Sequence, residues 1–222
     1  MMKLTYFNVR GLAETSRMLL ALNNQNGDRE EYDDFRYPLE VLDMSKYEMV
    51  KGEFDNDKKE GKLIQSLNKV PFLEIEGQII PQSKAIERFL AKRFGMMGDN
   101  DLEAARIDSI CECVRDFKDM YQKVRSADPD KKDSEMHQWF TVTLVERLTL
   151  LENLLGDDGF SVGTKLSLSD VVLYSFITGF FDNKEASMNA TLIAPRLRKV
   201  VDRVGNEPSM VEWLEKRPQT DF

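Results

Sequence analysis

Residues 69–83 read KVPFLEIEGQIIPQS, and the fold of the chain can be worked out from this stretch. A residue before proline is driven to extended backbone, so we expect Val70 to be extended. Pro71 has no N–H for a sheet ladder and suits the first position of a strand. Gly77 supplies the backbone freedom for a tight turn, after which a second strand leads to Ser83 at the start of a helix. The stretch therefore predicts a β-hairpin that runs directly into a helix.

The same stretch offers binding groups for a small anion. The first N–H groups of a helix have no partner inside the helix and lie at the positive end of its dipole, which favours an anion at Ser83. The Gln82 amide can both donate and accept, and the main chain of Val70 is expected to face away from the sheet. An extended peptide with a carboxylate end would satisfy these groups. The structural alternative is that Pro71 only starts a strand and Ser83 only caps a helix.

The residues around the hairpin predict a small α/β domain. Strands are expected at 3–7 and 29–37, and helices at 11–24 and 83–94. Residues 48–68 are polar and charged, so we expect a loop with one or two helical turns there.

Long helical patterns follow this region, with expected helices at 102–124, 134–156, 166–181, 190–204 and 206–215. Ser167 can cap the third of these, with Asp170 as its reciprocal partner. The fold class is therefore α/β plus all-α, with a first domain at 1–97 and a helical domain at 98–222.

Composition excludes several classes of function. The chain has 222 residues and a net charge of −8, with the acid spread along it, which disfavours nucleic acid or an anionic membrane as a partner. The chain start has no apolar run typical of a secretory signal, and no segment approaches the length of a membrane span. Its two cysteines, Cys111 and Cys113, are too close for a disulfide framework, which indicates a reducing, cytoplasmic setting. With His137 as the single histidine, we expect no metal site.

The quoted motifs resemble the cytosolic glutathione transferases, and within them the sigma-like class that includes the glutathione-dependent prostaglandin D synthases. The matching segments occur in the same order along nearly the whole chain: KLTYFNVRGLAE, NKVPFLEIEG, PQSKAIERFLAKRFG, LSLSDVVLYSF and RPQTDF. The resemblance implies a thioredoxin-like N-terminal domain, a helical C-terminal domain and a homodimer. It implies glutathione as co-substrate. Residues 25–67 look about twenty residues longer than in sigma-like enzymes.

The resemblance also assigns roles to residues of the hairpin and the first strand. It implies a cis peptide bond at Pro71, main-chain pairing of Val70 with the cysteinyl part of glutathione, and a γ-glutamyl carboxylate held by Gln82 and Ser83. It makes Tyr6 the catalytic residue. A thiol is a poor nucleophile, and a phenol that donates a hydrogen bond to sulfur favours the thiolate. Without the resemblance, Tyr6 would be interpreted as a half-buried strand tyrosine.

Further glutathione contacts follow from the same resemblance. An aromatic residue and a lysine hold the glycine carboxylate in the family, and Phe54 and Lys62 are the candidates here, with Lys58 as a rival. Lys69 also occupies a position where the family has a lysine. Asp116 matches an acidic residue through which the partner subunit touches glutathione.

Two departures from the sigma-like pattern bear on activity. Leu12 stands where these enzymes often have an arginine that supports the thiolate, so activation is expected to be weaker or to come from Arg10 or a helix dipole. Lys123 stands where the prostaglandin synthases have a tryptophan, so isomerase activity is not carried over. Apart from these two, Arg115 replaces one of three acids that bind a divalent ion in those synthases.

The sequence thus predicts an enzyme that adds the glutathione thiolate to small apolar electrophiles. Two alternatives stay open: a non-catalytic binding or structural protein of the same fold, and a glutathione-dependent isomerase or peroxidase.

Overall fold

The computed structural model describes residues 1–23, 30–43 and 48–220. The chain divides into two compact units, one formed by 1–90 with 212–222 and the other by 91–211. The sequence put the boundary after residue 97 and kept the C-terminal residues in the helical domain. The structure differs because the last residues return to the first unit, where Trp213 Nε1 donates to Glu14 over 3.2 Å.

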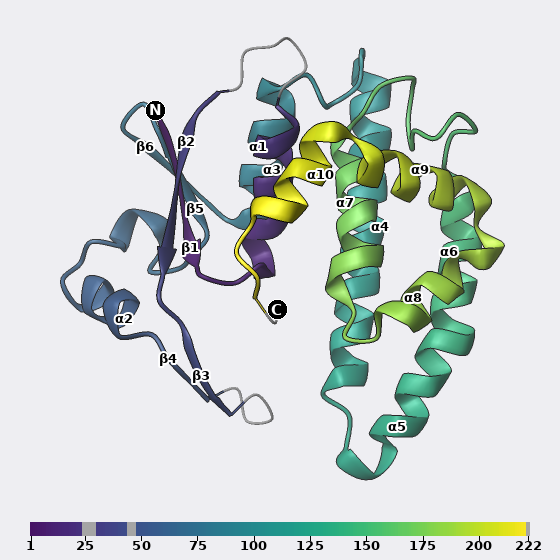
Figure 1. The fold of residues 1–222 in the computed structure, drawn as a ribbon, viewed down its shortest axis with the longest axis horizontal. Coiled ribbons are helices and arrows are strands. Elements are labelled where there is room, and N and C mark those ends of the chain that lie inside the picture. The colour runs from purple at the N-terminus through teal and green to yellow at the C-terminus, as the bar shows by residue number, and fades with distance from the viewer. Residues whose placement is uncertain (24–29, 44–47, 221–222) are drawn as a thin grey trace. The chain divides into compact units, whose positions relative to one another are not determined.

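The first unit is built on a four-stranded sheet with the strand order β2-β1-β5-β6. Strands β1 and β2 are parallel, and the other neighbouring pairs are antiparallel. Figure 1 shows α1 and α3 on one side of this sheet and α2 on the other. The elements of the sheet and its main helices are β1 (Met2–Phe7), α1 (Glu14–Leu22), β2 (Tyr32–Tyr37), α2 (Gly52–Lys59), β5 (Phe72–Ile75), β6 (Gln78–Pro81) and α3 (Ser83–Arg93).

The hairpin predicted at residues 70–81 is present as β5 and β6. Gly77, at φ +72°, lies in the turn between them, and Ser83 begins α3 at the point where the helix was expected. On the α2 side of the unit, Tyr37, Phe54, Leu63 and Phe72 form a buried apolar cluster. Burial of aromatic and aliphatic side chains is the main favourable term in folding, so this cluster fixes α2 to the sheet.

Residues 38–68 are more regular than the sequence indicated. Strands β3 (Glu40–Asp43) and β4 (Glu48–Val50) pair as a separate antiparallel sheet, and α2 follows before a 3₁₀ turn at Ile64–Ser66. The one or two helical turns predicted within 48–68 are present as α2 and the 3₁₀ turn, but β3 and β4 were not predicted. The strands were missed because they have only four and three residues, too few to show a period of two.

The second unit is all-helical, as expected. Helix α7 is buried along its whole length, since every residue of Leu168–Ser175 is buried, and it contacts both α4 and α9. Its start has the predicted capping box between Ser167 and Asp170. The helices of this unit are α4 (Asp101–Arg125), α5 (Pro129–Gln138), α6 (Leu144–Glu152), α7 (Leu168–Ser175), α8 (Lys184–Ala190), α9 (Pro195–Asn206) and the first part of α10 (Pro208–Lys216).

Two helical stretches differ from the sequence prediction. The single helix expected at 134–156 is α5 and α6 joined by a π-helical turn at Trp139–Thr143, and a second π turn at Phe176–Phe180 follows α7. The short helix α8 was not predicted, because its seven residues are too few to show a helical period. In the described part of the chain, no helix is long and apolar enough to cross a membrane.

Candidate active site

Five of the predicted site residues lie where β1 and β6 of the first unit end and β5 begins: Tyr6, Val70, Pro71, Gln82 and Ser83. Thr5 of β1 pairs with Phe72 of β5, and Phe72 pairs in turn with Pro81 of β6. Tyr6 follows Thr5, and Pro71 precedes Phe72 on the antiparallel neighbour, so continuing this register sets these two residues opposite each other. Residues 82 and 83 follow Pro81 on the next strand. Sheet pairing therefore gathers residues that are up to 77 positions apart in the sequence.

Tyr6 is held at this end of the sheet by the turn that follows β1. Its side chain is 8% exposed, and its hydroxyl oxygen accepts a hydrogen bond from the Leu12 main-chain N–H over 3.2 Å. Burial raises the pKa of Tyr6, while the Leu12 N–H and the charge of Arg17 act in the opposite direction. Because the net effect is upward, the phenol keeps its proton at neutral pH. An O–H whose oxygen already accepts one bond can donate its proton to a further partner.

Arg17 is a charged neighbour of Tyr6 that the sequence interpretation missed. It is fully buried in α1, and its Nε donates to both carboxylate oxygens of Asp34 over 3.1 Å. Its Nη1 donates to the carbonyl oxygen of Val9 over 2.7 Å, and its guanidinium carbon lies 5.9 Å from the centre of the Tyr6 ring. The available signal was a single arginine within the helix from Glu14 to Leu22, all of whose residues are buried. The structure therefore places Arg17 as a cation that acts on Tyr6.

The Val70–Pro71 peptide bond is cis. Both residues precede Phe72, the first paired residue of β5, and Pro71 is buried while Val70 is half-buried. Next to them, Gln82 has a φ of +75°, and its carbonyl accepts the first helical hydrogen bonds from Ala85 and Ile86 at 3.0 Å each.

Ser83 is half-buried in the first turn of α3, and the Gln82 side chain is exposed. The N–H groups of a helix's first turn have no acceptor inside the helix, so this end is suited to a carboxylate.

Three further predicted contacts have different surroundings: Phe54 and Lys62, the candidates for the glycine carboxylate, and Lys69, which the resemblance places at another lysine of the family. Phe54 is packed in the apolar cluster and is 8% exposed, so only a small part of its ring could contact a ligand. The Lys62 ammonium lies 2.8 Å from both Asp57 and Glu60, which hold it in place. Lys69 is exposed, next to Val70. Lys69 thus has the freest side chain of the three.

Asp116 belongs to the helical unit and lies on α4. Its side chain is 69% exposed, and one carboxylate oxygen is 3.8 Å from Arg115. Within the described residues, no group of three or more metal-binding side chains comes together. The prediction that no metal takes part remains a prediction.

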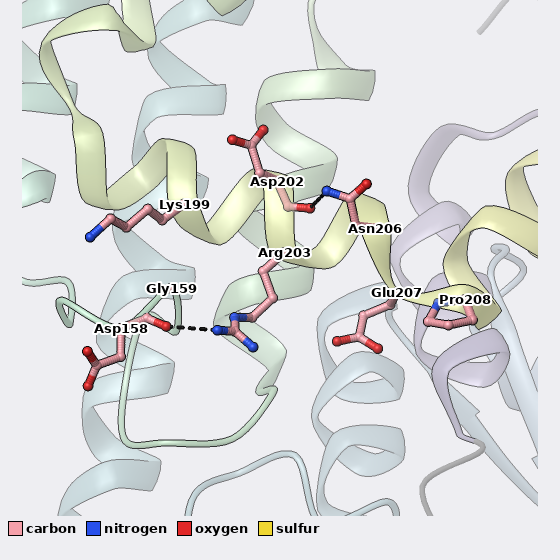
Figure 2. Close-up of a pocket in the computed structure, with 8 residues that line it drawn as sticks. All are labelled: Asp158, Gly159, Lys199, Asp202, Arg203, Asn206, Glu207 and Pro208. Carbon is pink, nitrogen blue, oxygen red and sulfur yellow. Dashed lines mark hydrogen bonds between the residues drawn. The ribbon is translucent and has the colours of Figure 1, made fainter.

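The helical unit also has a surface hollow of about 540 Å³ that contains none of the predicted site residues (Figure 2). Its two basic side chains bond to a facing loop: Arg203 Nη2 donates to the Asp158 carbonyl oxygen over 3.0 Å, and Lys199 Nζ donates to that of Asp157 over 3.1 Å. These bonds tie α9 to the loop after α6, so we interpret the hollow as a packing feature. It is lined by Asp158, Gly159, Lys199, Asp202, Arg203, Asn206, Glu207 and Pro208.

Comparison with known proteins agrees with this fold. Residues 115–217 match the family model described as glutathione S-transferase, C-terminal domain. The chain is 33% identical over 220 residues to the hematopoietic prostaglandin D synthase of Gallus gallus, covering 98% of this chain and 97% of that protein. It is 30% identical over 235 residues to S-crystallin 3 of Enteroctopus dofleini, covering 99% and 98%. The chain belongs to the glutathione S-transferase family.

The fold comparison leads to the same family. The crystal structure of a monomeric glutathione S-transferase from the human hookworm parasite Necator americanus superposes with a TM-score of 0.78 at 27% identity, covering 100% of this chain and 99% of that one. The predicted fold, a small sheet-and-helix domain of thioredoxin-like type followed by the helical domain of this family, is confirmed.

Proposed function

We propose that this protein is a sigma-like glutathione transferase that adds the glutathione thiolate to small apolar electrophiles. The observation that carries the proposal is the state of Tyr6: a buried phenol whose oxygen is fixed by a main-chain N–H and whose own proton is free to be donated. Such a group is suited to stabilising a thiolate beside it. Membership of the glutathione S-transferase family supports this use of the site.

In the proposed reaction, the cysteinyl thiol of glutathione loses its proton to water. The sulfur anion accepts a hydrogen bond from the Tyr6 hydroxyl and attacks the electrophilic carbon. The new carbon–sulfur bond forms as the leaving group departs with the electron pair of its bond. With an activated double bond as the acceptor, the π electron pair moves away from the attacked carbon instead, and the product then takes up a proton. A free thiol of pKa near 8.5 is only a few per cent ionised at pH 7, and each unit of lowered pKa corresponds to about 1.4 kcal/mol of preference for the thiolate.

Binding of the tripeptide would use the end of the sheet where β1 and β6 end and β5 begins. Val70 would pair its main chain with the cysteinyl residue beside Pro71, and Gln82 and Ser83 would hold the γ-glutamyl carboxylate at the start of α3. Lys69 is well suited to the glycine carboxylate because its ammonium is exposed. Phe54 and Lys62 remain in the proposed site, with the small exposed part of the Phe54 ring as its contact.

The wider setting is also proposed. A homodimer would bring Asp116 of the partner subunit to glutathione, as the resemblance implies. A cytoplasmic detoxification role fits a transferase that acts on apolar electrophiles. Sedimentation of the purified protein at micromolar concentration tests the dimer directly, and a monomer would remove Asp116 from the site.

The test of the proposal is a glutathione titration followed by conjugation of a general aryl halide. Replacing Tyr6 by phenylalanine should leave glutathione affinity within a few-fold. It should lower the conjugation rate by about 10- to 100-fold, since a hydrogen bond to a charged group is worth about 1.5–3 kcal/mol. An unchanged rate and pH profile in this variant would remove Tyr6 from its role.

A second variant tests the carboxylate site. Ser83→Ala should weaken glutathione binding by about tenfold, through loss of one bond to a charged group, with little change in the pH dependence of the rate. Normal affinity would mean that the carboxylate does not lie at the start of α3. Glutathione binding with no turnover of any electrophile would instead favour a non-catalytic protein. The similarity to S-crystallin 3 is the reason to test this alternative.

A further inference from the structure

The turn between β1 and α1 holds the Tyr6 hydroxyl through its main chain. The bond runs from the Leu12 N–H to the Tyr6 oxygen over 3.2 Å. Leu12 has an apolar side chain that is 58% exposed, so the side chain contributes no donor to this contact. The donor is a peptide group, and its direction is set by the conformation of the preceding residue.

That preceding residue, Gly11, meets two requirements that other residue types do not. Its φ of +40° is in the left-handed region, where a Cβ is strained. In addition, a Cβ built on Gly11 would lie 2.7 Å from the Tyr6 hydroxyl oxygen and 2.9 Å from the ring carbon Cε1. These separations are shorter than real contacts, so any side chain at position 11 would push the tyrosine hydroxyl away from the Leu12 N–H.

The Leu12 N–H acts on the pKa of Tyr6. In the described part of the chain, the groups that act on the Tyr6 pKa are the Leu12 N–H and the Arg17 guanidinium, both of which lower it against the effect of burial. Arg17 is fixed by Asp34 and by the Val9 carbonyl. A phenol oxygen that accepts a hydrogen bond also donates its own proton more strongly, because neighbouring hydrogen bonds polarise one another.

We propose that the Leu12 peptide N–H, aimed by Gly11, positions Tyr6 for its partner sulfur: it fixes the phenol oxygen and directs the O–H outward to donate. This inference rests on the proposed function for the sulfur partner, and on the geometry of the turn for everything else. Gly11 is therefore a positioning residue that acts through Tyr6.

The experiment compares Gly11→Ala with Gly77→Ala as a matched control. Gly77 has a φ of +72°, so alanine is strained there too, but a Cβ at that position meets nothing within 4 Å. The readouts are glutathione affinity by calorimetry and the pH midpoint of thiolate formation, followed by ultraviolet absorbance of the bound complex. Gly11→Ala should keep affinity within about threefold and raise the midpoint by about one pH unit, the shift that loss of one charge-assisted hydrogen bond allows. Gly77→Ala should not shift it.

A second measurement on the wild-type protein is decisive even if Gly11→Ala fails to fold. The Leu12 amide resonance is identified in ¹⁵N-leucine-labelled protein by its loss in Leu12→Ala. It should move at the pH at which the Tyr6 phenol ionises, and this movement should vanish in Tyr6→Phe. A Leu12 amide that does not respond to Tyr6 ionisation, or a Gly11→Ala protein with an unshifted midpoint, overturns the inference.

The proposed function and the role of the turn would be refuted by different results. If the wild-type chain binds no glutathione, or Tyr6→Phe leaves the thiolate midpoint unchanged, the proposed function is wrong. The Leu12 amide titration needs no glutathione, so it still decides whether the turn controls the phenol.

Discussion

Asp170, at the start of α7, is fully buried, and its carboxylate accepts three hydrogen bonds. Oδ1 accepts from the Ser161 N–H over 2.6 Å, and Oδ2 accepts from the Ser167 N–H over 2.7 Å and from its hydroxyl over 2.8 Å. These bonds close the first turn of the most buried helix of the second unit and tie it to the preceding loop. Replacing Asp170 by alanine removes both acceptor oxygens, and with them all three hydrogen bonds, and leaves the main-chain N–H groups buried.

The expected loss of unfolding free energy follows from the number of hydrogen bonds that Asp170 accepts. A hydrogen bond to a charged group contributes about 1.5–3 kcal/mol, so three bonds at the low end of the range give about 4–5 kcal/mol of unfolding free energy. For a chain of this size, 1 kcal/mol lowers the melting temperature by about 2–4 °C, so Asp170→Ala should melt about 8–20 °C earlier. Urea unfolding followed by circular dichroism, with the free energy extrapolated to water, measures the same loss independently.

Two further variants divide this loss between the bonds. Ser167→Ala removes one bond to Oδ2 and should cost about 1–2 kcal/mol, the usual effect of losing an N-cap side chain. Asp170→Asn can keep its oxygen at the Oδ2 position, where two donors meet, and then places an NH₂ group against the Ser161 N–H, so its cost should lie between the other two. If Asp170→Ala is no less stable than Ser167→Ala, the carboxylate does not act as the common acceptor and the reasoning is refuted.

Three other outcomes are expected. Glu14→Gln weakens the acceptor for Trp213 Nε1, so tryptophan fluorescence should shift to the red and trypsin should cut the C-terminal segment faster; unchanged digestion would contradict this. Burial raises the pKa of Tyr121 from 10.0 to about 12, so the folded state keeps a proton that the unfolded state loses between these values, and stability should fall as pH rises through that window. Tyr121→Phe should reduce this loss of stability with rising pH, as measured by urea unfolding at alkaline pH. Tyr37→Phe removes the 2.7 Å bond to Asp57 and should cost about 1 kcal/mol, measured in the same way.

Local signals in the sequence were sufficient for much of this fold. The proline before the hairpin, the glycine in its turn and the serine at the next helix predicted β5, β6 and α3 at their observed places. The capping box at Ser167 and Asp170 was predicted because its two residues are close in the sequence and depend on nothing beyond their own helix. Residues 48–50 and α8 escaped prediction because short elements have too few residues to show a period.

The candidate site was predicted only in part. Tyr6, Val70, Gln82 and Ser83 could be named from motifs, since each belongs to a short stretch with a recognisable pattern. However, these residues lie at the same end of the sheet because of the strand register, which cannot be read from the sequence. Phe54 was chosen because the resemblance implies an aromatic residue in that part of the chain, and tertiary packing put its ring into the apolar cluster.

By itself, the sequence determined the two kinds of domain, the hairpin–helix unit and the helix cap. Tertiary structure alone decided that Arg17 lies beside Tyr6 and that the Leu12 N–H meets its hydroxyl. It also decided that the last residues of the chain return to the first unit. The physical reason is that propensity, turn chemistry and capping act over a few residues. Burial of a charge and the approach of a main-chain donor to a side chain are set instead by atoms that only folding brings into contact.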